Sequence, residues 1–123
     1  MAVRSVENDL KIYMFKRLHP TYSPDAPNGL TSICLIDNDG NDYGLETISW
    51  SNPETTSGLE QNGSVVFEIT ATPSSPVSIV GFRLKFFNGV DEVNGVTETF
   101  SQGTYYFTGD GTLTLSSIDI DII

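Results

Sequence analysis

The strongest strand-like pattern in the chain lies in the stretch Ser64–Phe87, where two apolar runs follow each other closely. In the first run, apolar side chains recur at every second position, at Val65, Phe67, Ile69 and Ala71. This period predicts a half-buried β-strand, and the prolines of segment 72–76 predict its end, because proline cannot donate to a β-ladder. In the second run the apolar positions change parity at Val80-Gly81, which predicts a bulge or bend at Gly81. We expect this stretch to form the centre of the core.

Shorter apolar segments predict further strands on both sides of that centre. We expect strands at 30–36 and 43–50, and a short edge strand at 96–100. The residues Asn38-Asp-Gly40 favour a hairpin turn between the first two strands, because they tolerate positive φ angles. The side chains of the return strand that we expect to face the core are Leu45, Ile48 and Trp50.

The C-terminal third predicts a hairpin followed by a change of sheet. Asn-Gly pairs at 88–89 and 94–95 indicate turns before it. A three-residue loop would match the apolar faces of the hairpin by pairing Phe107 with Leu113 and Tyr105 with Leu115, with Gly111 in the left-handed conformation. Beyond Leu115 the parity flips at Ser116-Ser117. The flip predicts a strand that bends into another sheet or pairs elsewhere.

Residues 1–18 fit two alternatives. A helix would bring several apolar residues near one face, namely Val3, Val6, Leu10, Met14 and Leu18. The β-branched and aromatic content of segment 12–15 favours a strand instead. Segment 19–29 contains three prolines and ends in Asn-Gly, which predicts an extended connector closed by a turn. We therefore divide the chain into an N-terminal arm (1–18), a Pro-rich connector (19–29) and a β domain (30–123).

Length and composition place the chain among single-domain, β-rich proteins. Its 123 residues suffice for one core, and 38% hydrophobic with only 18% charged residues suits strands better than a helical bundle. The predicted fold class is all-β: an antiparallel two-sheet sandwich, immunoglobulin-like or jelly-roll-like, with an N-terminal arm. No apolar run approaches the roughly 20 residues of a membrane helix, and the first residues lack the features of a signal peptide. We expect synthesis in a cytoplasm and no membrane partner.

Charge is distributed unevenly along the chain, whose net charge is −10. Residues 1–18 hold four basic and two acidic residues, whereas the rest holds fourteen acidic residues and two basic ones, Arg83 and Lys85. A nucleic-acid footprint needs clustered Lys and Arg to meet phosphates. The distribution therefore excludes nucleic acid as a partner and describes a slightly basic arm on an acidic body.

Candidate catalytic chemistry is sparse. His19 is the only histidine and stands beside proline in the connector, where we expect it to be solvated. Cys34 is the only cysteine, and its apolar neighbours predict a buried, inert thiol. Phosphate-binding glycine loops and His/Cys metal motifs are absent from the sequence. We predict that the protein is not an enzyme and needs no cofactor.

An acidic cluster after the strand 30–36 offers one metal alternative. Calcium prefers several carboxylate and carbonyl oxygens close together, and the candidate ligands are Asp37, Asp39 and Asp42. Their spacing does not match an EF-hand loop, because Asp42 and Ile48 stand where glycine and glutamate belong. A hairpin turn explains the same residues better.

The chain as a whole resembles the small β-sandwich structural proteins of tailed-bacteriophage virions, such as head decoration (cement) proteins and small neck or tail components. The likeness is one of organisation: a Met1-Ala2 start, a basic arm, a Ser/Thr-rich body and an apolar final strand. It implies symmetric copies, plausibly trimers, bound in the virion to a larger shell such as a major capsid protein. The residues that would make these contacts lie in the arm and the last strand: Leu10, Ile12, Tyr13, Met14, Phe15, Lys16, Arg17, Ile118, Ile120 and Ile122.

A recognition module is the alternative function, as a carbohydrate-binding or immunoglobulin-like domain. Sugar binding uses flat aromatic platforms with an apolar face. The candidates are Trp50, Tyr105 and Tyr106, and for each the competing interpretation is core packing.

Overall fold

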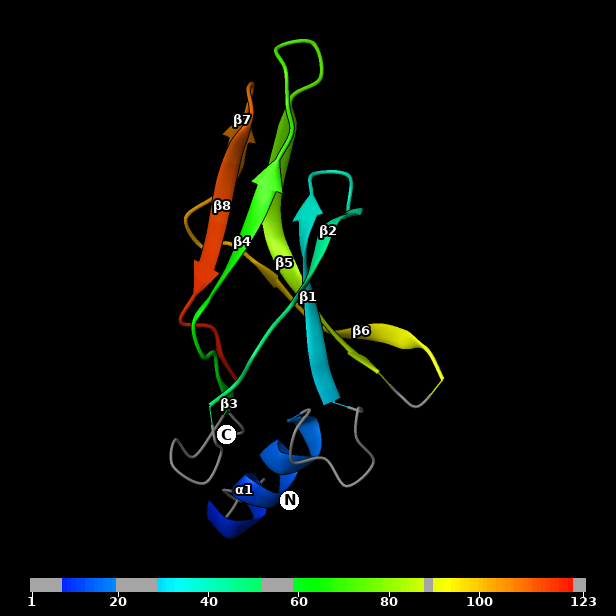
Figure 1. Ribbon diagram of the computed structural model, residues 1–123, viewed down its shortest axis with the longest axis vertical. Coiled ribbons are helices and arrows are strands. Elements are labelled where there is room, and N and C mark those ends of the chain that lie inside the picture. Colours follow the sequence, from blue (N-terminus) through cyan, green and yellow to red (C-terminus); the bar gives the residue numbers. More distant parts are fainter. Residues whose placement is uncertain (1–7, 20–28, 52–58, 88–89, 121–123) are drawn as a thin grey trace, which may run out of the picture.

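The computed structural model describes residues 8–19, 29–51, 59–87 and 90–120, and shows a mostly β chain of antiparallel strands with one N-terminal helix (Figure 1). Its elements in chain order are α1 (Asn8–Leu18), β1 (Gly29–Asp37), β2 (Asp42–Thr47), β3 (Leu59–Glu60), β4 (Ser64–Ile69), β5 (Val77–Phe87), β6 (Glu92–Thr99), β7 (Tyr105–Phe107), β8 (Gly111–Ser116) and β9 (Asp119–Ile120). Within this part of the chain, no helix has the length and hydropathy that crossing a membrane requires.

The main sheet has five strands in the order β2-β1-β5-β6, with β7 also paired to β5. β5 is its central strand: Gly81–Phe87 pairs with β6, and Val77–Ile79 pairs with β7. The predicted irregularity near Gly81 is confirmed, because the β1–β5 register steps from Ile36↔Gly81 to Asp37↔Ile79 and leaves Val80 as the extra residue. This bulge is the reason that the buried positions of β5 change parity between Ile79 and Leu84.

Two small sheets, β4–β8 and β3–β9, complete the fold. The two pairs follow each other along one ribbon, since β3 leads into β4 and β8 leads into β9 (Figure 1). Ser117 lies between β8 and β9 with φ 63°, a left-handed conformation that is uncommon outside glycine. At Ser117 the chain passes from pairing with β4 to pairing with β3, so the predicted break after Leu115 is confirmed, and the strand continues along the same ribbon rather than entering the main sheet.

One hydrophobic core joins the main sheet to the β4–β8 pair. The predicted alternation in β4 is confirmed, because Val65, Phe67 and Ile69 are buried and the residues between them are exposed. The core also takes side chains from β1, β5, β8 and the segment after β2, including Ile33, Leu35, Ile48, Trp50, Ile79, Leu84 and Leu113. The Asn38–Gly40 turn is also confirmed, with Gly40 at φ 84°.

The predicted hairpin of residues 105–115 is wrong. β7 pairs with β5 through Val77↔Phe107, whereas β8 pairs with β4 through Phe67↔Leu113. Apolar faces match in the observed pairing as well as in the predicted hairpin. In the observed pairing β7 meets the longer strand β5 instead of β8, and β8 meets the six-residue β4 instead of the three-residue β7. Gly111 does not adopt a positive φ but lies against the Phe107 ring, where an added Cβ would meet that ring at 3.3 Å.

The preference for a strand in the arm is also wrong, because Asn8–Leu18 is helical. Phe15 is fully buried and Leu18 packs against the core, so apolar side chains one turn apart secure the helix. Lys16 and Arg17 occupy the last turn, where basic side chains interact favourably with the helix dipole. The helical alternative placed Met14 on the buried face, yet Met14 is exposed.

Three smaller predictions need correction. Leu45 faces solvent with 54% of its surface exposed, because Gly44 at φ 71° breaks the alternation of the return strand. The Asn94-Gly95 pair lies inside β6, where the register shift between Leu84 and Lys85 leaves Gly95 as a bulge rather than a turn. The edge strand expected at 96–100 thus begins at Glu92. Most of the connector (20–28) and the Asn88-Gly89 turn lie outside the described residues.

Candidate functional site

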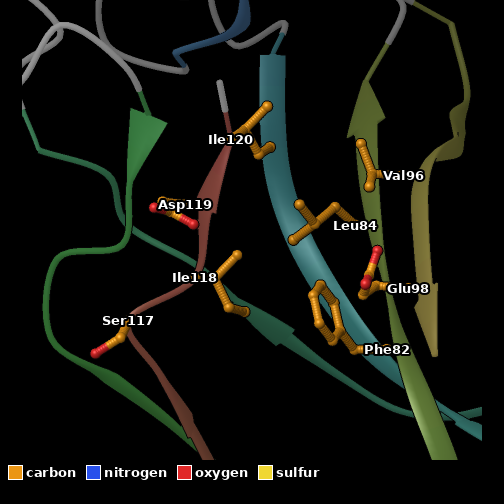
Figure 2. Close-up of a pocket in the computed structure, with 8 residues that line it drawn as sticks. All are labelled: Phe82, Leu84, Val96, Glu98, Ser117, Ile118, Asp119 and Ile120. Atoms are coloured by element: carbon orange, nitrogen blue, oxygen red, sulfur yellow. The ribbon is translucent and has the colours of Figure 1, made fainter. Parts of the chain in front are cut away.

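A groove of about 350 Å³ lies between β5 and β6 of the main sheet and the segment Ser117–Ile120 (Figure 2). Its lining residues are Phe82, Leu84, Val96, Glu98, Ser117, Ile118, Asp119 and Ile120. We call this feature the groove. Concave, largely apolar surfaces are where binding sites usually form.

Strand register places the first four groove residues together. Leu84 pairs with Val96 and Phe82 pairs with Glu98, and cross-strand partners share one face of a sheet. Ile118 and Ile120 come from the opposite side and point toward Leu84 and Phe82 (Figure 2). The floor of the groove is therefore apolar. Strand alternation places Phe82, Leu84, Val96 and Glu98 on the sheet face that borders it.

Glu98 gives the groove its charge. Its side chain projects from the same face of β6 as Val96, while the carboxylate of Asp119 points away from Phe82 and Leu84 (Figure 2). A carboxylate beside an aromatic and two aliphatic walls favours a ligand that is apolar and carries a cation. Charged side chains that point inward on an edge strand also discourage indiscriminate strand pairing.

Gly81 fixes the position of β6 beside β5. A Cβ at this position would collide with the backbone carbonyl oxygen of Glu98, so the two strands reach their approach only because residue 81 is glycine. Next to this contact, Phe100 packs against Phe82 with ring centroids 6.2 Å apart and meets Tyr105 edge-on at 5.3 Å. These aromatic contacts hold the chain that leaves β6.

The basic residues of the body are bound on the other face of β5. Asp42 forms ion pairs with Arg83 and with Lys85, the latter at 2.6 Å between Nζ and Oδ2. The hydrogen bond from Lys85 lowers the pKa of Asp42, and the same bond raises the pKa of Lys85. Burial, reinforced by the nearby Asp42 carboxylate, raises the pKa of the Cys34 thiol to about 11. The predicted buried thiol is thus confirmed, and it is held in its protonated form at neutral pH.

The C-terminal end of α1 is anchored through His19, the residue that had been expected to be solvated. The backbone N–H of His19 donates to the Phe15 carbonyl at 2.9 Å, and its Nε2–H donates to the Trp50 carbonyl at 3.0 Å. Trp50 Nε1–H in turn donates to the Leu30 carbonyl at 2.8 Å. His19 is 6% exposed, so the prediction of a solvated histidine is wrong: the carbonyl of the buried Trp50 gives its ring a partner inside the fold.

The solvent-exposed side of α1 carries other side chains than the side that holds the buried Phe15. Tyr13 is 61% exposed and Met14 38%, and Arg17 is exposed one turn after Tyr13. Residues four apart lie on the same helix face, so Tyr13 and Arg17 form one apolar and basic surface opposite the buried Phe15. We call Tyr13, Met14 and Arg17 the outer face of α1.

The structure separates the residues predicted for an interface. Ile118 and Ile120 line the groove, Tyr13, Met14 and Arg17 form the outer face of α1, and Phe15 packs inside its own chain. Ile12 and Lys16 are half-buried. Ile122 and the side chain of Leu10 lie outside the described residues.

The residues predicted to bind sugar or calcium do not form one site among the described residues. Trp50 is 5% exposed and cannot act as a platform, whereas Tyr105 and Tyr106 are 42% and 63% exposed. Asp37 Oδ1 accepts hydrogen bonds from the backbone N–H groups of Asp39 and Asn41, both at 2.9 Å, as a turn residue does. Among residues 8–19, 29–51, 59–87 and 90–120, no three His, Cys, Asp or Glu side chains gather as a metal site would require.

The sequence interpretation missed the main-sheet half of the groove. The assignment of Leu84 to the core is confirmed, because Leu84 is fully buried. The roles of the partly exposed Phe82, Val96 and Glu98 as groove residues were not predicted, since Phe82 had been assigned to the core and the other two to a short edge strand. A sequence signal for these residues exists in β6 but is weak. Val96 and Glu98 lie two residues apart on one strand face, whereas the bulge at Gly95 puts Val93 out of step with them. Comparison of the chain with family models, with curated proteins and with solved structures gives no match.

Proposed function

We propose that the protein is a non-enzymatic structural subunit of a multi-copy assembly, of the kind found among the head decoration and small neck or tail proteins of tailed-phage virions. Its finer architecture in this proposal is a two-sheet sandwich, and its location is the virion. The observation that carries the proposal is the groove, an apolar surface between two strands, β6 and β9, each of which ends its sheet.

Strand edges explain why such a surface needs a partner. In the described chain, β6 pairs only with β5, and β9 pairs only with β3, so each strand keeps one unpaired edge. Edges of this kind beside apolar side chains are normally covered in folded proteins, and a subunit contact is one way of covering them. An acidic body keeps copies apart until a specific contact forms.

The proposal is tested by mass and by shell binding. We expect sedimentation velocity to show self-association of the purified chain at high concentration, and we expect the chain to cosediment with capsid shells of the tailed phage that encodes it. A chain that remains monomeric and stays in the supernatant with those shells would contradict the proposal.

A recognition module is the second candidate, and the two exposed tyrosines favour it. Tyr106 is 63% exposed, and Tyr105 beside it is held edge-on against Phe100. Exposed aromatic rings in adjacent positions provide apolar surface for sugars. A glycan array with the wild type and Tyr106→Ala decides this candidate: binding that the substitution abolishes supports it, and no binding by the wild type rejects it.

A further inference from the structure

We propose that the groove receives the outer face of α1 from a second copy of this chain, with Tyr13 entering the groove and Arg17 facing Glu98. This inference rests on the proposed assembly function and names the contact through which copies meet.

The chemistry of the groove selects the occupant. Its apolar surface comes from the partly exposed Phe82, Ile118 and Ile120, while Leu84 beside them is fully buried, and its wall carries the Glu98 carboxylate. An apolar side chain on the floor removes hydrocarbon from water, and a cation beside Glu98 compensates the desolvation of that carboxylate. The occupant must therefore offer an aromatic or aliphatic group and a basic group a few ångströms apart.

Within this chain, the described residues that meet both requirements lie on α1. The sequence has six basic residues, and the two in the body, Arg83 and Lys85, are bound to Asp42 on the other face of β5. The others belong to residues 1–18, and Arg17 is exposed one turn from the largely exposed Tyr13. A second copy thus supplies an apolar and basic surface that is complementary in charge to the groove.

The contact joins two different surfaces of the subunit. None of the described α1 side chains, residues 12–18, lines the groove of its own chain, so each copy uses the outer face of α1 toward one neighbour and the groove toward the other. Such a head-to-tail contact closes into a ring when the rotation between copies allows it. The outer face of α1 consists of Tyr13, Met14 and Arg17, far fewer than the roughly 20–30 residues that each partner contributes to a stable interface. We therefore expect weak pairwise association that becomes effective in a ring or on a shell.

A charge exchange tests the contact directly. Arg17→Glu and Glu98→Lys each place like charges opposite one another, and we expect each to lower the association constant at least about tenfold in sedimentation velocity at low salt. The double variant R17E/E98K restores opposite charges and should recover association to within about threefold of the wild type. Glu68→Lys, at an exposed position of β4 away from the groove, makes the same change in net charge as Glu98→Lys and should leave association unchanged. Far-UV circular dichroism confirms folding of each variant.

Disulfide trapping gives a second measurement. Tyr13→Cys and Val96→Cys variants, mixed under mild oxidation, should form a disulfide-linked dimer, because the proposed contact brings the two positions together. Cys34 does not compete, since it is fully buried and its thiol pKa is raised to about 11. Tyr106→Cys mixed with Val96→Cys is the matched control, and it should remain uncrosslinked.

The outcomes separate this inference from the proposed function. If the wild type associates but the charge exchanges and the cysteine pair have no effect, the α1 contact is overturned and the assembly function stands. If the wild type is monomeric up to the highest soluble concentration, the contact is overturned, and cosedimentation with shells decides the function independently. Trapping of the cysteine pair together with recovery by R17E/E98K supports the contact.

Discussion

The two sides of the molecule differ in how the main sheet meets the small sheets. On one side the chain continues from β2 into residues 48–51, which bond to both the main sheet and a small sheet. Ile48 N–H donates to the Thr31 carbonyl of β1, and Ser51 N–H donates to the Glu60 carbonyl of β3. Trp50 also bridges to Gln61. On the other side, β6 and the segment Ser117–Ile120 face each other across the groove. We call these the bonded side and the groove side.

This difference indicates where stability and binding reside. On the bonded side Ile48 and Trp50 are 2% and 5% exposed and backbone groups are paired. On the groove side Val96 is 36% exposed, and the outer edge of β6 is unpaired in the described chain. Regions with fewer buried contacts contribute less to global stability and are free to serve recognition. Substitutions on the bonded side should therefore change stability more than substitutions on the groove side.

The largest effect is expected on the bonded side. Trp50→Ala removes a buried ring and its hydrogen bond to the Leu30 carbonyl, and should lower the free energy of unfolding by about 3–5 kcal/mol. Urea unfolding followed by circular dichroism measures the change. Leu45→Ala, on the exposed surface of β2, is the control and should change stability by less than about 0.5 kcal/mol. Similar losses for both variants would remove the distinction between the sides.

Gly81→Ala should cost about 1–3 kcal/mol, because its Cβ collides with the Glu98 carbonyl and forces β5 and β6 apart. Since β6 carries Val96 and Glu98, the same variant should also weaken self-association. Gly109→Ala is the matched control, because an added Cβ there meets no atom within 4 Å. Thermal unfolding of the two variants beside the wild type distinguishes them, and equal melting temperatures would show that the approach of the strands is adjustable.

Asp42→Asn should cost about 0.5–1 kcal/mol at neutral pH, because the ion pairs with Arg83 and Lys85 are partly exposed. The pKa of Asp42 is lowered in the fold, so its stabilising contribution is present above the ordinary carboxyl pKa of 3.8 and is lost as the pH falls through the lowered pKa. The Lys85 pKa is raised, so the pair persists at alkaline pH until that raised pKa is passed.

Urea midpoints measured from pH 7 down to pH 3 should therefore converge for the wild type and Asp42→Asn. Asp39→Asn, which makes the same substitution in the neighbouring exposed turn, is the control variant. A constant difference between the wild type and Asp42→Asn down to pH 3 would contradict the assignment of the pH dependence to this pair.

The smallest effect is expected at the groove. Val96→Thr should change the free energy of unfolding by less than about 0.5 kcal/mol, because Val96 is an exposed edge residue. The same substitution at Val65, which is 7% exposed in β4, should cost about 1–3 kcal/mol, since it buries a hydroxyl group. Chemical denaturation of both variants measures the two changes in the free energy of unfolding. A large loss of stability in Val96→Thr would show that the groove side belongs to the stabilising core.

Local patterns predicted the elements whose signals are local. The alternation of β4, the turn at Asn38–Gly40 and the bulge beside Gly81 depend on neighbouring residues, and each was predicted correctly. The β7–β8 hairpin failed because Tyr105 and Phe107 satisfy the same parity rule with β5 as with β8. Sequence period fixes which face of a strand is apolar but not which strand it meets.

The candidate site was predicted in part for the same reason. Ile118 and Ile120 alternate with aspartates in the last strand, which predicted an apolar face, and both residues line the groove. Glu98 was invisible as a site residue, because its position opposite Ile118 depends on a pairing of sheets that no local pattern encodes. The helix was missed because burial of Phe15, a tertiary contact, outweighs the strand preference of residues 12–15.

The ribbon formed by β3–β4 and β8–β9 has a consequence for synthesis of the chain. Its partners are distant in sequence, as in Leu59↔Ile120 and Val65↔Leu115, so none of these ladders forms before the last strands leave the ribosome. Until then β4 lacks its partner strand β8, and the apolar side chains of Phe67 and Ile69 are exposed to solvent in the nascent chain. Pairings of long range also fold slowly. Slow translation or chaperone capture during this interval should therefore decide the yield of native protein.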